Sequence, residues 1–276
     1  MFYTRLQVVC AQEFSEILMA EIAEAGFDTF METEKGFEAY AEKTDYDKSS
    51  LQQIKDKYAT ITPVVFYQDR VEKQNWNEEW ERDYEPIIVE DKCMIRASFH
   101  QPVKSYPYEI IITPKMSFGT GHHQTTYLMI KAQLDMNHLN KTVMDAGTGT
   151  GVLAIMASKL GARSVDAFDI DEWSILNSTE NVDLNACKNV VIRQGKISDL
   201  TFETEFDIVL ANINKNILLE EIHQYAAYLT TGGMLLVSGF YEKDIPDLLT
   251  EAHRYSLVQA QADVRDSWAC LLLVKG

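Results

Sequence analysis

The stretch Val143-Met144-Asp145-Ala146-Gly147-Thr148-Gly149-Thr150-Gly151, followed by residues 152–157 (Val-Leu-Ala-Ile-Met-Ala), decides the fold. An apolar run ends in an acidic residue, three glycines then alternate with small residues, and a helical pattern follows. This order predicts a strand, a tight turn and a helix N-terminus, which together form the entrance to a nucleotide-type site in an open α/β sheet. Glycine suits such a turn because it takes positive φ and lets the backbone approach a ligand closely.

The spacing of the glycines indicates which ligand the turn binds. A dinucleotide fingerprint reads G-x-G-x-x-G, but here glycine recurs at every second position and Val152 stands where the third dinucleotide glycine would be. Asp145, at the end of the strand, also places a negative charge where a pyrophosphate would sit. A ligand with cationic groups fits better, and S-adenosylmethionine carries both an ammonium and a sulfonium. We therefore expect Asp145, Gly147 and Gly149 to contact this cofactor.

A second acidic residue supports a nucleoside ligand. Ser164–Asp169 is predicted to be the next strand, and Asp169 follows Gly147 by 22 residues. A carboxylate at that strand tip can accept hydrogen bonds from both hydroxyls of an adenosine ribose. The alternative is an ordinary glycine turn in which Asp169 only caps the next helix. The pairing of the turn with the acid favours the cofactor.

The composition indicates a globular protein with an acidic surface. The chain has 276 residues, enough for two domains, and 46% of them are hydrophobic. No apolar run approaches the ~20 residues of a membrane span, and the N-terminus lacks a signal-peptide profile. The four cysteines form no C-x-x-C pair, so we expect reduced thiols, no metal site and a cytoplasmic location. We expect no membrane association.

The charge balance bears on the partner. Lys and Arg total 25 against 42 Asp and Glu, a formal net charge of −17. A chain with this charge and no concentrated basic patch repels nucleic acid and attracts a basic partner. Asn212-Ile213-Asn214 also lacks the aromatic residue with which base-methylating enzymes stack a flipped base. We therefore expect no direct nucleic-acid substrate.

The N-terminal region predicts a small α+β domain. Its strands and helices alternate in the order β-α-β-β-α-β, and Lys35-Gly36 marks a hairpin between the second and third strands. The predicted elements are residues 2–9, 12–25, 27–34, 37–42, 49–58 and 62–71. This order is a ferredoxin-like unit. It contains no histidine and no evident catalytic pair, so a binding role and a purely structural role remain equally open.

An aromatic segment separates this region from the rest of the chain. Trp76, Trp80 and Tyr84 are four residues apart on one helical stripe, and Pro86 ends the pattern. We interpret residues 71–89 as a linker helix, residues 1–70 as the ferredoxin-like domain and residues 90–276 as a Rossmann-like α/β domain with a seven-stranded sheet. Strands are expected at 87–99 and 108–113, and a turn at Gly232-Gly233.

A loop and a strand tip supply the other candidate residues. Residues 114–126 contain two glycines and lead into a helix, which suits a loop over a bound ligand. His122 and His123 are adjacent, so they do not face one metal, and we expect one of them to shape the loop by hydrogen bonding.

The strand at 206–211 ends at Asn212. A strand tip opposite the glycine turn is where an acceptor should meet a methyl donor.

Several segments together resemble one family, the PrmA methyltransferases, which trimethylate ribosomal protein L11. The family loop A-F-G-T-G-T-H-P-T-T resembles Ser117–Thr126, and the family's aromatic linker with its proline resembles residues 75–86. The family motifs D-x-G-x-G-x-G, D-I-D and A-N-I-L resemble residues 145–151, 169–171 and 211–214. The likeness covers essentially the whole chain. It implies a class I methyltransferase that uses S-adenosylmethionine and recognises L11 through its N-terminal domain. We also expect the chain to work as a monomer.

The resemblance also implies particular site residues. The cofactor contacts would be Phe118, Thr126, Gly147, Asp169 and Asn212, and no metal is required. Three residues depart from the family pattern: His122 replaces a threonine, Gln124 a proline and Asn214 a leucine. The first two affect the stiffness of the loop, and the third lies beside the acceptor position.

Methyl transfer is an in-line displacement that requires alignment and a neutral amine. We expect the Asn212 side chain to hold the hydrogens of a lysine or α-amine and to direct its lone pair. Two alternatives stay open at this point. One is a methyltransferase of another protein or of a small molecule, and the other is a non-catalytic protein that docks on a basic partner.

Overall fold

The computed structural model describes residues 2–11, 14–33, 35–42, 46–59, 62–72, 85–102, 105–114 and 123–276. The chain divides into two compact units, Met1–Asp83 and Tyr84–Gly276. The aromatic stripe predicted for the linker helix lies outside the described residues. None of the helices that the structure describes is long and apolar enough to cross a membrane.

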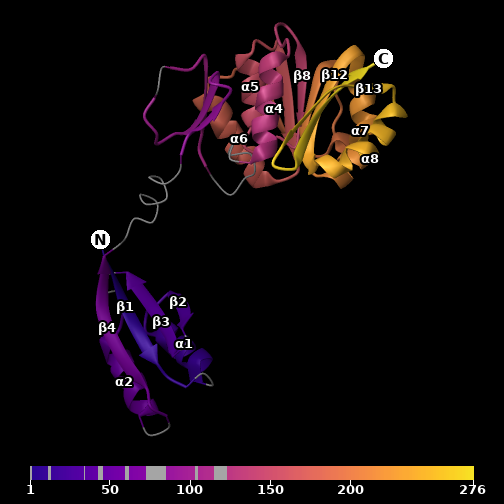
Figure 1. The fold of residues 1–276 in the computed structure, drawn as a ribbon. Coiled ribbons are helices and arrows are strands. Elements are labelled where there is room, and N and C mark those ends of the chain that lie inside the picture. Colours follow the sequence, from indigo (N-terminus) through magenta and orange to yellow (C-terminus); the bar gives the residue numbers. More distant parts are fainter. Residues whose placement is uncertain are drawn as a thin grey trace. The chain divides into compact units, whose positions relative to one another are not determined.

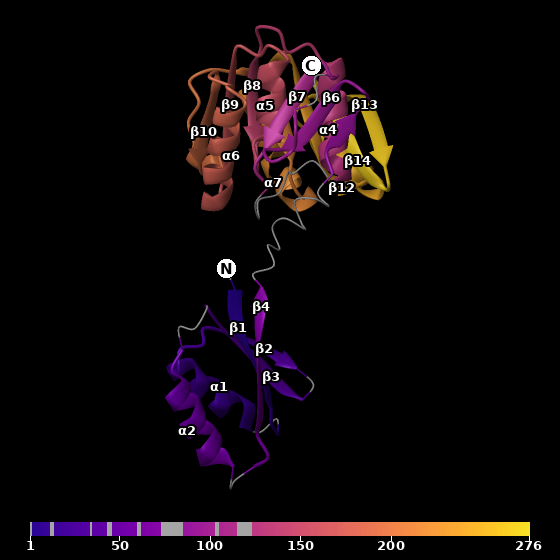
Figure 2. The same ribbon diagram turned by 90° about the vertical axis from the view of Figure 1, so that its left-hand side faces the viewer.

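The first unit has the predicted order of elements. They are β1 (Phe2–Val9), α1 (Ser15–Glu24), β2 (Thr29–Thr33), β3 (Gly36–Glu42), α2 (Lys48–Tyr58) and β4 (Val65–Glu72). The strands pair antiparallel in the order β2-β3-β1-β4. Both helices cover the same face of this sheet (Figure 2) and enclose a core that includes Leu6, Ile22 and Phe37.

Local chemistry explains the hairpin and the second helix of this unit. Gly36 has φ +140, and a Cβ there would lie 2.1 Å from the Val8 carbonyl oxygen, so the hairpin requires glycine. The side chain of Asp47 accepts a hydrogen bond from the Ser49 amide at 2.8 Å and caps α2. These two local signals fix where the third strand and the second helix begin.

The second unit is built on a seven-stranded sheet. Its strands are β8 (Thr142–Ala146), β9 (Ser164–Asp169), β10 (Val190–Gln194), β11 (Phe206–Asn212), β12 (Leu229–Tyr241), β13 (Leu257–Arg265) and β14 (Trp268–Lys275). Their order is β10-β9-β8-β11-β12-β14-β13, and β14 runs antiparallel to both of its neighbours. The order reverses direction between β8 and β11. Such a switch point opens a crevice at the carboxyl ends of the strands, where open α/β sheets bind ligands.

Helices cover both faces of this sheet (Figure 1). α4 (Gln124–Asp135), α5 (Val152–Lys159) and α6 (Glu172–Leu184) lie on one face, and α7 (Lys215–Tyr228) and α8 (Ile245–His253) on the other. The short helices η2 (Ile197–Asp199) and η3 (Glu242–Asp244) follow β10 and β12. Two buried apolar clusters result, one on each face of the sheet.

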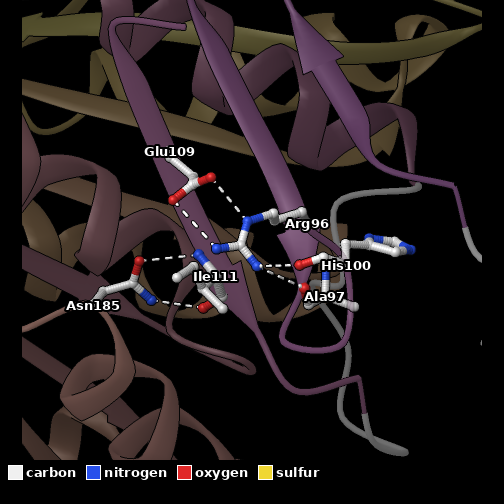
Figure 3. Close-up of polar contacts among 6 residues, drawn as sticks. All are labelled: Arg96, Ala97, His100, Glu109, Ile111 and Asn185. Carbon is white, nitrogen blue, oxygen red and sulfur yellow. Dashed lines mark hydrogen bonds and ion pairs between the residues drawn. The ribbon is translucent and has the colours of Figure 1, made fainter. Parts of the chain in front are cut away.

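A small third sheet packs against the α4–α6 layer. It consists of β5 (Ile87–Val89), β6 (Cys93–Ala97) and β7 (Tyr108–Ile112), in that order, and its apolar residues join the core of the α4–α6 face. Figure 3 shows Arg96, whose buried guanidinium donates to Glu109 at 2.8 Å and to the His100 carbonyl at 2.9 Å. This pairing satisfies the buried charge.

Two predicted boundaries are wrong. The single strand expected at 87–99 is broken by a turn, because Glu90 and Asp91 take positive φ and Lys92 N donates to the Val89 carbonyl at 3.0 Å. The turn expected at Gly232-Gly233 instead lies inside β12, which already pairs with β11 at Leu229. At 90–92 a local turn interrupts the expected strand, whereas at 232–233 strand pairing outweighs the local turn signal.

Candidate active site

A cavity of about 620 Å³ lies at the carboxyl ends of the central strands. It brings together four of the predicted site residues: Gly147, Gly149, Asp169 and Asn212. The other lining residues used below are His123, Ile170, Asp171, Lys196, Ile213, Asn214, Glu220, Glu221, Tyr225, Gly239 and Trp268. Phe118 lies outside the described residues, while Thr126 and Asp145 do not line the cavity.

The alternating glycines form the turn between β8 and α5. Gly147, Gly149 and Gly151 have φ values of +67, +54 and +83, a region that side-chain-bearing residues rarely adopt. At Gly147 a Cβ would lie 2.3 Å from Ile213 Cγ2, so the turn also passes close to the tip of β11. Thr148 N donates to the Phe168 carbonyl at 3.0 Å and joins the turn to β9. Both Gly147 and Gly149 line the cavity.

Asp169 occupies the tip of β9 and faces the cavity. Its Oδ2 accepts a hydrogen bond from Gly149 N at 2.9 Å, and its Oδ1 accepts one from Asp171 N at 3.0 Å. Each carboxylate oxygen can accept a further bond, so two ribose hydroxyls can be held. The alternative role of Asp169 as a helix cap is wrong, because α6 is capped by Asp171, which accepts from Ser174 N at 2.9 Å.

Asp145 supports the turn from the inside. It is fully buried, and its Oδ2 accepts hydrogen bonds from Thr148 Oγ1 at 2.7 Å and Ala154 N at 3.1 Å. Burial raises the pKa of Asp145 to about 7. The expectation that this carboxylate faces the ligand does not match the geometry, because the side chain points into the core beneath the turn.

Two residues at the start of α4 have different environments. Thr126 is fully buried, and its Oγ1 has no hydrogen-bond partner among the described residues. His123 lines the cavity and caps α4, because its Nδ1 accepts from Thr125 N at 3.3 Å. Desolvation lowers the pKa of His123, which favours the neutral ring. The hydrogen bond of His123 thus caps the helix, and the loop that one histidine of the pair was predicted to shape lies outside the described residues from 115 to 122.

Residues at the ends of β11 and β12 also line the cavity, next to the glycine turn. The Oδ1 atom of Asn212 is buried and accepts no hydrogen bond from any described residue. Asn214, one of the departures from the family pattern, caps α7 by accepting from Ile217 N at 3.2 Å. At Gly239 a Cβ would lie 2.1 Å from the Ile213 carbonyl oxygen, so glycine permits this close approach. An unpaired buried acceptor beside the glycine turn suits a ligand that donates an N–H.

The sequence did not single out several lining residues, namely Lys196, Glu220, Glu221, Tyr225 and Trp268. His123 and Trp268 meet with ring centroids 4.5 Å apart, although they come from opposite ends of the domain. Tyr225 donates a hydrogen bond to Glu221, and burial raises the pKa of that phenol. The charged side chains of the lining are four acids against one lysine, namely Asp169, Asp171, Glu220, Glu221 and Lys196. Asp169 and Asp171 belong to the Asp-Ile-Asp segment noted in the sequence, whereas no local pattern signals Lys196, Glu220 or Glu221.

These residues fit S-adenosylmethionine. Asp169 offers two acceptors for the ribose, Ile170 and Ile213 offer apolar surface for the adenine, and the predominantly acidic lining suits a ligand that carries an ammonium and a sulfonium. Among the described residues, no group of three or more His, Cys, Asp or Glu side chains is arranged to hold a metal ion.

Comparison with known proteins identifies the family. The family model for ribosomal protein L11 methyltransferase (PrmA) matches residues 8–276. A ribosomal protein L11 methyltransferase of Porphyromonas gingivalis is 42% identical over 258 residues, which cover 93% of this chain and 89% of that protein. The protein of the same name from Bacteroides fragilis is 39% identical over 267 residues, which cover 96% of this chain and 95% of that protein.

A solved structure gives the same result. The ribosomal protein L11 methylase of Lactobacillus delbrueckii subsp. bulgaricus matches with a TM-score of 0.64 and 30% identity, and the match covers 70% of this chain and 100% of that one. The family suggested by the glycine turn, the Asp-Ile-Asp segment and the Asn-Ile strand tip is confirmed. This chain belongs to the ribosomal protein L11 methyltransferase (PrmA) family, whose members are S-adenosylmethionine-dependent protein methyltransferases.

Proposed function

We propose that this protein transfers methyl groups from S-adenosylmethionine to amino groups of ribosomal protein L11. The observation that carries the proposal is the Oδ1 atom of Asn212, a buried acceptor without a hydrogen-bond partner among the described residues, at the tip of β11 beside the glycine turn. A neutral amine can donate to this atom the N–H hydrogen bond that no described residue supplies. The names of the related proteins supply the substrate.

The chemistry requires a neutral amine aligned with the donor. S-adenosylmethionine supplies an electrophilic methyl group on a sulfonium. A lysine amine has a reference pKa near ~10.4, so it must lose a proton before it attacks. Desolvation in the cavity lowers that pKa, and Asn212 Oδ1 accepts one N–H and directs the lone pair. The Nδ1 of His123 already accepts from Thr125 N, so that atom is not free to act as a base.

The site residues are proposed as follows. Gly147, Gly149 and Asp169 hold the nucleoside, and Asn212 both borders the cofactor and positions the amine. Thr126 and Phe118 stay predictions that rest on the resemblance. The buried Thr126 Oγ1 would need a partner that the described residues do not offer.

The domain roles are also proposals. Residues 1–70 would be a ferredoxin-like domain that recognises the ribosomal protein, residues 71–89 a linker, and residues 90–276 the class I methyltransferase domain. The net charge of −17 and the acidic cavity lining support a basic protein as substrate rather than nucleic acid. We propose that the enzyme works as a monomer in the cytoplasm, where ribosomal proteins are made.

The test is methyl transfer to purified L11. The wild-type protein should transfer radiolabel from S-adenosylmethionine to L11, and mass spectrometry should locate the methyl groups on its amines. Asn212→Ala should lower kcat by about a hundredfold, because the amine loses its positioning acceptor. Asn189→Ala serves as the control, since this asparagine bonds Ser158 and the Ala162 carbonyl outside the cavity and its loss should leave kcat near the wild-type value.

Transfer to another protein or to a small molecule, with none to L11, would overturn the proposed substrate and leave the methyltransferase assignment in place. Wild-type kcat in Asn212→Ala would remove that residue from the mechanism.

A further inference from the structure

Helix α6 presents polar side chains, rather than an apolar stripe, to the rest of the domain. Its buried residues are Ser174, Asn177, Ser178, Asn181 and Val182. Asn177, Asn181 and Asn185 are four residues apart, so they lie along one side of the helix. Asn177 and Asn181 are fully buried, and Asn185, the C-cap residue of the helix, is partly buried. Buried amides are stable when they are hydrogen-bonded, so the partners of these side chains show what the helix does.

These asparagines bind the open edge of β7. Asn185 Oδ1 accepts from Ile111 N at 3.0 Å, and its Nδ2 donates to the Ile111 carbonyl at 2.6 Å, as Figure 3 shows. Thr113, two residues after Ile111, is bound in the same way by two side chains. Asn181 Oδ1 accepts from Thr113 N at 2.8 Å, and Asn177 Nδ2 donates to the Thr113 carbonyl at 3.1 Å. Side chains of α6 and of its C-cap residue therefore hydrogen-bond the backbone at the open edge of β7 and just after it, where no neighbouring strand pairs among the described residues.

Asn181 differs from the other two because its donor points elsewhere. Its Nδ2 donates to the carbonyl of Thr150 at 2.8 Å, within the glycine turn, and the side chain is fully buried. One amide therefore joins two separate backbone segments, Thr113 on one side and the turn on the other. The turn lies close to α6 here, since a Cβ at Gly151 would be 3.2 Å from Ser178 Cβ.

We propose that Asn181 is a positioning residue for the cofactor. Its amide holds the glycine turn in the conformation that exposes Gly149 to the cavity and ties that turn to the segment after β7. This inference rests on the proposed use of the turn as the cofactor cradle. Loss of the donor removes a buried hydrogen bond from the Thr150 carbonyl, and the turn then relaxes away from the binding geometry. Cofactor binding must afterwards restore that geometry, which weakens affinity.

The experiment compares Asn181→Ala with Asn185→Ala in the full-length protein. Asn185 makes three part-buried hydrogen bonds, to β7 and to the Asn181 carbonyl, and none of them goes to the turn. Both variants should lower the thermal midpoint by a similar amount. Calorimetry should show the Kd for S-adenosylmethionine raised about tenfold in Asn181→Ala and less than twofold in Asn185→Ala. At saturating cofactor, kcat of Asn181→Ala should stay within about threefold of wild type, because bound cofactor restores the turn.

A second variant tests whether the raised Kd of Asn181→Ala comes from the lost hydrogen bond or from misfolding of that variant. Asn181→Leu keeps the approximate volume of the side chain but loses the donor to Thr150, so it should also raise the Kd about tenfold. Equal Kd values in Asn181→Ala and Asn185→Ala, or a wild-type Kd in Asn181→Leu, would overturn the proposal. Because the readout is cofactor binding, it is independent of whether L11 is the acceptor. Failure of wild-type protein to methylate L11 would refute the proposed function alone.

Discussion

The carboxyl group of Asp145 is fully buried beneath the glycine turn, and burial raises its pKa to about 7. In the unfolded chain an aspartate titrates near ~3.9, so between these two values the folded protein holds a proton that the unfolded chain has lost. The stability that this group contributes is thus present at low pH and is lost as the pH rises toward 7. By linkage the loss reaches roughly 4 kcal/mol at most.

We predict that Asp145→Asn removes this dependence of folding stability on pH. An amide keeps an acceptor for Thr148 Oγ1 and Ala154 N and carries no charge at any pH in the range. Denaturant titrations of cofactor-free protein should show the variant gaining stability relative to wild type between pH 5 and pH 8. The exposed Asp199, changed to Asn, is the control and should track the wild type. Parallel profiles for wild type and Asp145→Asn would contradict the prediction.

Among the elements, the junction between β11 and β12 depends on a glycine. Gly239 has φ +100, and a Cβ there would lie 2.1 Å from the Ile213 carbonyl oxygen. Gly232 in the same strand has φ +75, but a Cβ there would meet nothing within 4 Å. Alanine at either position carries the cost of positive φ, about 1 kcal/mol, and only Gly239→Ala adds a clash with backbone.

We therefore expect Gly239→Ala to lower the thermal midpoint several degrees further than Gly232→Ala. It should also reduce kcat at least tenfold, because the displaced Ile213 carries Asn212 with it. Gly232→Ala should keep kcat close to wild type, since Gly232 does not line the cavity. Equal effects of the two substitutions on kcat would show that the close approach at Gly239 does not position the active site.

At the scale of the whole molecule, the two units have separate cores. The core of the first contains only residues of that unit, and the two cores of the second lie within Tyr84–Gly276. If the first unit serves as the recognition domain, its deletion removes a tethered contact to the substrate without touching the cofactor cavity. Tethering of this kind is worth 10²–10⁴ in apparent affinity as an order of magnitude.

The prediction is that a protein lacking residues 1–83 binds S-adenosylmethionine within about twofold of the full chain. Its kcat/KM for L11 should fall about a hundredfold or more. Calorimetry measures the first quantity, and radiolabel transfer at low substrate concentration measures the second. Unchanged kcat/KM would assign the first unit a role other than substrate recognition.

Much of the site follows from the sequence because its signals are local. The alternating glycines predict a turn with positive φ, and the structure has one. Asp169 and Asn212 each end an apolar run, and because parallel strands share one carboxyl edge, both line the same cavity. Such strand-end residues are brought together by the fold class itself.

The remaining features required the tertiary structure. β8 is buried on both faces, so no alternation in the sequence shows that Asp145 points inward. Trp268 reaches the cavity because β14 inserts between β12 and β13, and Asn181 reaches Thr150 because α6 packs against the turn. The chain alone thus determined the strand ends and turns, whose signals lie within a few neighbouring residues. Strand order and helix packing decided which distant side chains meet them, because those contacts depend on pairing across the whole sheet.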